Sequence, residues 1–350
     1  MRIAIVGTEL CAVDPRGGGL EQVLRRWAMV LAERHEVSVV SHGRPAASAD
    51  PYSTIVLERT SDLRPTLAGL APDVVCLNNR PQWVSLCPPA AAIGVVFHNY
   101  PAAWKLGPAA RNDLRRPGGR AASLGAVSRA LASAAAVELG APVESVVVLP
   151  PSIDPAYLAV PDRRPEPIVL APNRLLAKKG VRDLLDVAAR AEFRGVTFSF
   201  ADLISPWRRP TAEHRSLRAA VGRVGNARLF APAAAPEELA HRYATSGVVA
   251  CPVREPEGLG LVALEAQACG APLVTTDLGG LREATFAPNA CVPAGDLDAL
   301  AAALLAALDQ RGVDASGPRQ HVIARHSPTA SGAAFEAWLT AVVSGGGPRR

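Results

Sequence analysis

Short runs of apolar residues alternate with helical patterns through the first half of the chain. Runs rich in Val and Ile predict buried strands at residues 2–6, 36–41, 73–77, 93–98, 124–128 and 143–149. Between the first two runs, apolar residues recur from Leu20 to Leu31 at the spacing of one helical face. Because continuous apolar strands separated by helices are typical of parallel sheets, this half predicts an α/β domain with helices on both faces of its sheet.

The pattern stops in a proline-rich stretch and then begins again. Residues 149–167 lack periodicity and mark the best domain boundary. Beyond them we expect strands near residues 168–171, 197–201, 227–230, 247–251, 272–276 and 291–293, and helices that include 181–191, 236–244, 297–308 and 330–343. The predicted order is an N-terminal domain (1–150), a linker (151–166), a C-terminal domain (167–328), a last helix (329–343) and a disordered tail (344–350).

Composition agrees with two globular domains. A chain of 350 residues is too long for one ordinary core, and 49% of its residues are hydrophobic while 20% are charged. No apolar run reaches the roughly 18 residues of a membrane helix, and the N-terminus lacks a signal-peptide pattern. Six scattered cysteines without CxxC spacing favour reduced thiols, so we expect a cytoplasmic protein without a zinc site or disulfide framework.

The net charge of +5 is carried almost wholly by arginine, and lysine occurs only at Lys105, Lys178 and Lys179. No nucleic-acid-binding motif is present, and aromatic residues, at 5%, are too few for a base-stacking platform. We therefore expect no nucleic-acid partner.

The stretch 255–280, EPEGLGLVALEAQACGAPLVTTDLGG, is the most informative part of the chain. If a helix begins at Leu261, Glu257 lies at its entrance and Glu265 about one turn inside it. Loop amides and a helix N-terminus favour an anion, whereas two carboxylates repel one. A ligand with both phosphates and hydroxyls, such as a nucleotide-sugar, fits this combination. An amphipathic helix with two solvated acids is the alternative.

Basic residues follow the first predicted strand of the C-terminal domain. Arg174, Lys178 and Lys179 come just before a helical pattern. Arginine offers a planar fork for phosphate oxygens and lysine a compact charge, so together they could neutralise a diphosphate without a metal. The alternative is a solvated turn.

Two features of the N-terminal domain are weaker signals. Gly17, Gly18 and Gly19 precede a helix, where absent side chains let backbone amides approach a phosphate, but the spacing is not that of GxGxxG. His98 ends a predicted strand, at the edge where such sheets bind ligands. A flexible loop and a structural histidine are the respective alternatives.

Two charged clusters have simpler explanations. One is basic and could meet an anionic acceptor, an anionic membrane surface or only solvent; it comprises Lys105, Arg111, Arg115, Arg116, Arg120 and Arg129. The other is the DxD pair Asp296 and Asp298, which opens a helical pattern. We interpret that pair as a helix cap rather than a metal site.

Taken in order, several motifs form a recognisable series: Gly18-Gly19, His98, Ser152-Ile153-Asp154, Arg174 to Gly180, Glu257 to Glu265, and Gly279 to Glu283. The series resembles the retaining nucleotide-sugar glycosyltransferases of family 4, which have the GT-B fold of two Rossmann-like domains facing a central cleft. The resemblance is clear over about residues 145–285, where the two-glutamate motif, the Ala-Cys-Gly-Ala-Pro turn and the Gly-Gly loop stand in register. It is looser in the N-terminal domain.

The resemblance implies roles for individual residues. Arg174 and Lys179 would bind the donor diphosphate, Glu257 would lie near the sugar hydroxyls, and Glu265 would receive the ribose hydroxyls. Amides of Leu259, Gly260 and Leu261 would meet the sugar and β-phosphate. From the other domain, Gly18 or Gly19 would close on the phosphate and His98 would touch the sugar. The helix at 329–343 would pack back on the N-terminal domain.

The chain departs from the family pattern at Pro151-Ser152, at Asn173 and at residues 201–205, which puts the nucleobase and sugar specificity in doubt. The expected enzyme is a metal-independent retaining glycosyltransferase without a cofactor, acting on a small bacterial metabolite or natural product. Synthesis of an envelope polysaccharide or glycolipid is one alternative, and a non-catalytic nucleotide-sugar-binding protein is another. A phosphorylase or sugar-phosphate synthase is a further alternative; a phosphorylase needs a cofactor-bearing lysine, which three lysines make improbable.

Overall fold

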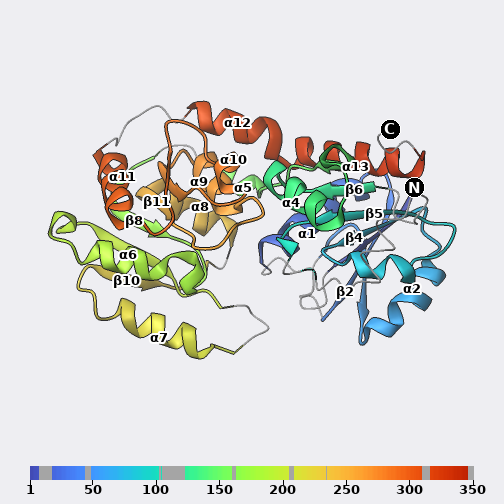
Figure 1. The fold of residues 1–350 in the computed structure, drawn as a ribbon, viewed down its shortest axis with the longest axis horizontal. Coiled ribbons are helices and arrows are strands. Elements are labelled where there is room, and N and C mark those ends of the chain that lie inside the picture. Colours follow the sequence, from blue (N-terminus) through green and yellow to red (C-terminus); the bar gives the residue numbers. More distant parts are fainter. Residues whose placement is uncertain are drawn as a thin grey trace. The chain divides into compact units, whose positions relative to one another are not determined.

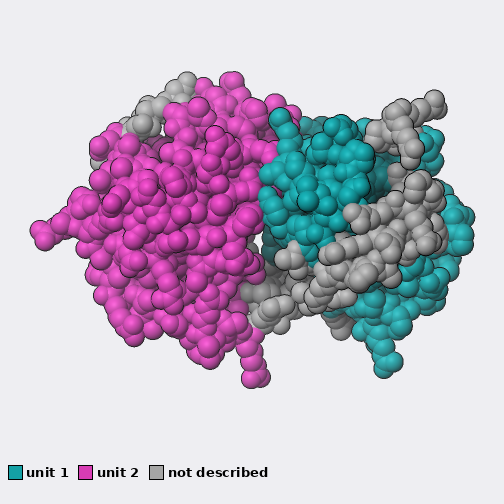
Figure 2. Space-filling model, viewed as in Figure 1, with its two compact units in different colours: residues 1–152, 328–350 teal, residues 153–327 magenta. Residues whose placement is uncertain are grey.

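A computed structural model describes residues 1–7, 18–43, 49–101, 104, 123–159, 163–204, 209–233, 235–309 and 316–345. The chain divides into two compact units (Figure 2). Unit 1 comprises residues 1–152 together with 328–350, and unit 2 comprises residues 153–327. Each unit is built on one parallel sheet (Figure 1).

The sheet of unit 1 has seven parallel strands in the order β3-β2-β1-β4-β5-β6-β7. Their bounds are β1 Arg2–Val6, β2 Glu36–His42, β3 Ser53–Leu57, β4 Val74–Asn78, β5 Ala92–Phe97, β6 Ser123–Ala126 and β7 Val146–Val148. Six of them match predicted strands within a few residues. The exception is β3, an edge strand in which only Leu57 is buried, so it has no apolar run to reveal it. The predicted strand at 143–149 shortens to β7, because residues 143–145 form a 3-10 turn.

The described helices of unit 1 are α1 Gly19–Ala32, α2 Leu63–Leu70, α4 Arg129–Leu139 and α13 Pro328–Val343. Helix α13 lies against α1 and the sheet (Figure 1). Trp27 of α1 donates from Nε1 to Ser331 Oγ at 2.8 Å and stacks on Phe335, with ring centroids 4.1 Å apart. Trp338 crosses β5 so closely that a Cβ on Gly94 would lie 2.5 Å from its ring. The chain's last helix therefore completes the core of unit 1.

Unit 2 has six parallel strands in the order β10-β9-β8-β11-β12-β13. They are β8 Glu166–Ala171, β9 Thr197–Ala201, β10 Ala227–Phe230, β11 Ser246–Cys251, β12 Leu273–Thr276 and β13 Ala290–Val292. Its helices are α5 Pro155–Leu158, α6 Val181–Ala188, α7 Ala212–Val221, α8 Pro236–Thr245, α9 Leu261–Ala268, α10 Leu281–Ala284, α11 Leu297–Asp309 and α12 Ser316–His326. Phe193, Phe198 and Phe200 are fully buried in the core between α6, α7, α11 and the sheet.

In both sheets the strand order reverses beside the first strand of the unit. The reversal lies between β1 and β4 in unit 1, and between β8 and β11 in unit 2. At such a point the loops after two neighbouring strands leave in opposite directions, and ligands of doubly wound sheets bind in the crevice that opens there. These two strand ends are therefore where functional side chains should gather.

Across the described ranges, the helices are too short or too polar for any of them to cross a membrane. Of the predicted tail 344–350, only residues 344 and 345 lie in the described part, where Ser344 continues the hydrogen bonding of α13.

Candidate active site

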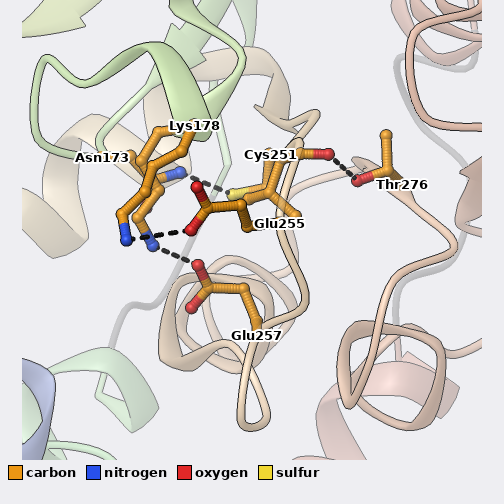
Figure 3. A network of polar contacts seen from close by, with 8 residues as sticks. Asn173, Lys178, Cys251, Glu255, Glu257 and Thr276 are labelled. Atoms are coloured by element: carbon orange, nitrogen blue, oxygen red, sulfur yellow. Dashed lines mark hydrogen bonds and ion pairs between the residues drawn. The ribbon is translucent and has the colours of Figure 1, made fainter. Parts of the chain in front are cut away.

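The loops that follow β8 and β11 meet at the strand reversal of unit 2, and charged side chains bridge them. Lys179, after β8, forms an ion pair with Glu257, after β11, and the two side chains are 13% and 27% exposed. Beside this pair, Lys178 contacts Glu255 at 3.1 Å, but both of these side chains are about half exposed or more. Figure 3 shows the Lys178 amino group directed at the Glu255 carboxylate of the opposite loop. Of these two pairs, Lys179–Glu257 is the better shielded from solvent, so its charged groups can act more strongly on a ligand.

Close backbone packing fixes these two loops. Gly180 has φ +73°, and a Cβ there would lie 1.9 Å from the carbonyl oxygen of Pro252. The amide of Arg254 donates to the carbonyl of Lys178 at 2.8 Å. The Arg254 guanidinium binds both carboxylate oxygens of Asp183, in the first turn of α6, at 2.6 Å each. The loops thus form one rigid body that holds Lys179 and Glu257 in place.

Beneath the ion pairs, side-chain hydrogen bonds join the ends of three strands (Figure 3). Asn173 Nδ2 contacts Cys251 Sγ at 3.2 Å, and Thr276 Oγ1 donates to the carbonyl of Val253 at 2.8 Å. Burial raises the pKa of the Cys251 thiol to about 12, so it stays protonated. None of these residues was singled out from the sequence for this role, because their contacts join positions up to 78 residues apart.

Arg174 differs from the lysines, because no described residue pairs with it. It lies three residues beyond β8, its side chain is exposed, and within the described ranges it makes no hydrogen bond or ion pair. A guanidinium that is not engaged by the protein can receive phosphate oxygens at two of its nitrogens.

The entrance to α9 supplies backbone donors. Gly260 precedes the helix with φ +100°, and within the described residues the amides of Leu259, Gly260 and Leu261 make no hydrogen bond. Gly280 supports this loop: its amide donates to the carbonyl of Glu257 at 2.8 Å, and a Cβ on it would lie 2.2 Å from the carbonyl oxygen of Gly258. Unpaired amides at a helix N-terminus are a site for an anion.

Glu265 lies in the second turn of α9 and is 8% exposed. Tyr243 of α8 donates its hydroxyl to Glu265 Oε2 at 2.8 Å. Burial, followed by the charge of Glu265, raises the pKa of Tyr243 well above its ordinary value. The phenol therefore keeps its proton and remains a hydrogen-bond donor to Glu265. Tyr243 is a partner that sequence reasoning missed.

The remaining candidates belong to unit 1. His98 follows β5 and is 7% exposed, with Nε2 3.0 Å from Asn78 Oδ1. Burial lowers the pKa of His98 to about 3, so the imidazole is neutral. Gly18 and Gly19 form the exposed start of α1, whereas Gly17 and the rest of that loop lie outside the described residues. Arg174, Lys179, Glu257, Glu265 and the α9 amides thus share unit 2, while His98, Gly18 and Gly19 share unit 1.

The DxD pair is a helix cap, as predicted. Asp296 Oδ1 accepts from the amides of Asp298 and Ala299 at 3.2 and 2.9 Å, and Asp298 pairs with Arg190. In the part of the chain that the structure describes, no three His, Cys, Asp or Glu side chains gather as metal ligands would. Of the basic cluster, only Arg129, the exposed first residue of α4, lies in the described ranges.

Comparison with known proteins gives the class. Residues 159–324 match the family model described as glycosyl transferases group 1. The GDP-mannose-dependent alpha-(1-6)-phosphatidylinositol monomannoside mannosyltransferase of Mycolicibacterium smegmatis is 28% identical in an alignment of 330 positions, which covers 83% of this chain and 85% of that protein. The D-inositol 3-phosphate glycosyltransferase of Acidothermus cellulolyticus is 34% identical in a shorter alignment of 163 positions, which covers only 41% of this chain and 36% of that protein.

Solved structures agree on the architecture. Sucrose-phosphate synthase from Thermosynechococcus elongatus superposes with a TM-score of 0.76 at 18% identity, covering 98% of this chain and 99% of that one. Anabaena Alr3699/HepE, solved in complex with UDP, gives a TM-score of 0.75 at 19% identity, covering 97% and 100%. The two parallel-sheet units are those of the GT-B fold, and the chain is a glycosyltransferase.

Proposed function

We propose that the chain transfers a sugar from a nucleoside-diphosphate sugar to an acceptor hydroxyl, with retention of the anomeric configuration. The observation that carries this proposal is the shielded Lys179–Glu257 pair at the strand reversal of unit 2. In the described part of the chain, Arg174 and the amides at the entrance to α9 are not engaged in hydrogen bonds. Cations and amide donors suit a diphosphate, while the two carboxylates, Glu257 and Glu265, suit hydroxyls.

In this proposal Arg174, Lys179 and the amides of Leu259, Gly260 and Leu261 stabilise the negative charge that develops on the leaving diphosphate. Preorganised donors of this kind supply the largest share of many rate enhancements. Glu257 holds the Lys179 amino group in position and accepts from sugar hydroxyls, and Glu265 accepts from the ribose. Positive side chains take the place of a metal ion, so no cofactor enters the scheme.

Retention follows from attack on the face from which the diphosphate departs. The bond from the anomeric carbon to the phosphate oxygen breaks, its electron pair stays on the diphosphate, and the acceptor oxygen forms the new bond on the same face. The acceptor proton passes to a phosphate oxygen. We assign His98 to the transferred sugar and Gly18 or Gly19 to the phosphate, and closure that excludes water would prevent hydrolysis of the donor.

Similarity to a GDP-mannose-dependent enzyme over 83% of the chain makes GDP-mannose the first donor to test. UDP-glucose is the second, because Anabaena Alr3699/HepE was solved in complex with it. A small metabolite is the acceptor that we propose. The same mannosyltransferase, which acts on a phosphatidylinositol monomannoside, favours a second candidate, an inositol-containing glycolipid reached by peripheral contact with a membrane.

Thermal shift with each donor, followed by a product assay with labelled donor, tests the proposal. At one hundred times its dissociation constant, a donor should stabilise the protein by about 2.7 kcal/mol. Lys179→Ala should lower kcat by roughly 100-fold or more while leaving the unfolding transition intact. Lys178→Ala removes an exposed pair and should cost far less. Near-wild-type turnover by Lys179→Ala, or donor binding without product, would contradict the assignment.

A further inference from the structure

Two asparagines at the end of β4 hold the His98 imidazole in one orientation. Asn79 Oδ1 accepts from the backbone amides of His98 and Asn99 at 2.7 and 3.3 Å, which fixes the chain where β5 ends. Asn78 Oδ1 lies 3.0 Å from His98 Nε2. The Trp27 ring packs beside the imidazole, with centroids 5.7 Å apart. The ring therefore has little freedom to turn.

The amide of Asn78 can be oriented in only one way. Its Nδ2 lies 3.0 Å from the carbonyl oxygen of Val6 and 3.3 Å from that of Cys76. Carbonyl oxygens only accept hydrogen bonds, so the NH₂ group must face them and the oxygen must face His98. Because that oxygen also only accepts, His98 Nε2 must carry the proton.

The other ring nitrogen is then an acceptor. A neutral imidazole with a protonated Nε2 has a lone pair on Nδ1. Burial alone accounts for the low pKa of His98, and within the described residues no charged group contributes to it. Among the residues that the structure describes, Nδ1 has no hydrogen-bond partner, and His98 keeps 7% of its surface exposed at the ligand edge of the sheet.

We propose that Asn78 is a positioning residue that makes His98 a pure hydrogen-bond acceptor and thereby selects a donor sugar with a hydroxyl facing Nδ1. A hydroxyl can donate to this nitrogen, whereas a carboxylate or phosphate presents only lone pairs and would be left unpaired and repelled. The selected class is thus a sugar that is neutral at the contacted position. This inference rests on the proposed function, because it assigns the ligand at His98 to the donor sugar.

Nitrogen-15 NMR of protein labelled at histidine tests the tautomer without any ligand. The His98 signals, assigned by their loss in His98→Phe, should show protonated Nε2 and unprotonated Nδ1 between pH 5 and 8. In Asn78→Asp, a carboxylate that faces Nε2 should favour the imidazolium and protonate Nδ1. A protonated Nδ1 in the wild-type protein would overturn the inference, whether or not the variant folds.

Binding of deoxyfluoro donors tests the hydroxyl. Fluorine replaces a hydroxyl at similar size but cannot donate, so one of the 2-, 3-, 4- or 6-deoxyfluoro analogues of GDP-mannose or UDP-glucose should bind at least tenfold more weakly than its parent. Calorimetric affinities are used because fluorine also alters reactivity at the anomeric carbon. In His98→Phe that difference should disappear.

Equal affinity for every fluoro analogue would overturn the inference. So would a set of fluoro analogues whose losses of affinity all persist in His98→Phe, because the losses would then come from other contacts such as Glu257. Failure of both parent donors to bind would instead contradict the proposed function, while the NMR result would still decide the role of Asn78.

Discussion

Three side chains near the candidate residues are each held in one protonation state, mainly by burial. Cys251 and Tyr243 keep their protons because burial raises their pKa values, and His98 stays neutral because burial lowers its pKa to about 3. Hydrogen-bond donors and acceptors are therefore fixed before any ligand arrives. Groups fixed in this way can stabilise charge that develops during a reaction without first having to reorient.

Tyr243→Phe should weaken ribose recognition. Without the phenol, Glu265 Oε2 loses the hydrogen-bond donor that orients it, so the preference for GDP-mannose over its 2′-deoxyribose analogue should change by several-fold, equivalent to about 1 kcal/mol. Calorimetric dissociation constants for the two ligands measure it. Tyr52→Phe is the matched control, because it removes a similar 2.8 Å bond to Asp50 in unit 1. An unchanged preference in Tyr243→Phe would refute the positioning role.

His98 should make the protein less stable in acid. The unfolded imidazole protonates near its ordinary pKa of 6.5, whereas the folded one stays neutral down to about 3. Below pH 6.5 the unfolded state therefore binds one more proton, and the free energy of unfolding falls as pH falls. Between pH 6.5 and 5 the loss should be on the order of 2 kcal/mol. Urea unfolding measures the free energy of unfolding at each pH. In His98→Gln this free energy should fall less steeply with pH, by the slope that one proton contributes. Equal slopes in the wild-type protein and the variant would contradict the assignment.

Sequence spacing could suggest Lys179, Glu257 and Glu265, since each falls in a local motif beside a predicted strand or helix. It could not suggest Asn78, Tyr243 or Arg254. Their importance comes from contacts such as Tyr243 with Glu265 and Arg254 with Asp183, which join residues 22 and 71 positions apart. No local pattern records a pairing of that kind.

At the scale of elements, the buried strands of both sheets were predictable because parallel strands covered on two faces are almost wholly apolar. Thr197–Ala201 and Ala227–Phe230 match the predicted bounds. The edge strand Ser53–Leu57 was not predictable, because a strand exposed on most of its length has no apolar run. The bounds of helix α7, where only His214, Leu217 and Val221 are buried, were not predicted for a similar reason.

Gly180 lies between β8 and α6, where the close backbone approach leaves no room for a methyl group. Gly180→Ala should destabilise the protein by more than about 2 kcal/mol and weaken donor binding, because the chain must move away from Pro252 and carry Lys179 with it. Gly195→Ala is the matched control: its φ is +86°, but no atom lies within 4 Å of the added Cβ, so only about 1 kcal/mol is expected. Urea unfolding and donor affinity measure both variants, and equal losses would refute the close-approach argument.

At the scale of the whole molecule, unit 1 depends on a helix from the far end of the chain. Trp338 of α13 is 5% exposed and donates to Ser123 Oγ at 2.9 Å. Trp338→Ala should destabilise unit 1 by about 3 to 5 kcal/mol. Tryptophan fluorescence during urea unfolding reports it, since Trp27, Trp83 and Trp104 remain in that unit. Val137→Ala, at an 83% exposed position of α4, should leave the midpoint unchanged. Equal midpoints for the two variants would show that α13 contributes little.

The division of the chain also sets an order of events during synthesis. Unit 2 is one continuous segment, 153–327, so all of it is synthesised before α13. The first 152 residues must meanwhile wait with Trp27 and the Gly94 face of β5 uncovered, for about 10 to 35 s at ordinary elongation rates. The segment translated first is therefore the last to finish folding. A chaperone that shields the nascent chain must bind residues 1–152 for longer than it binds unit 2.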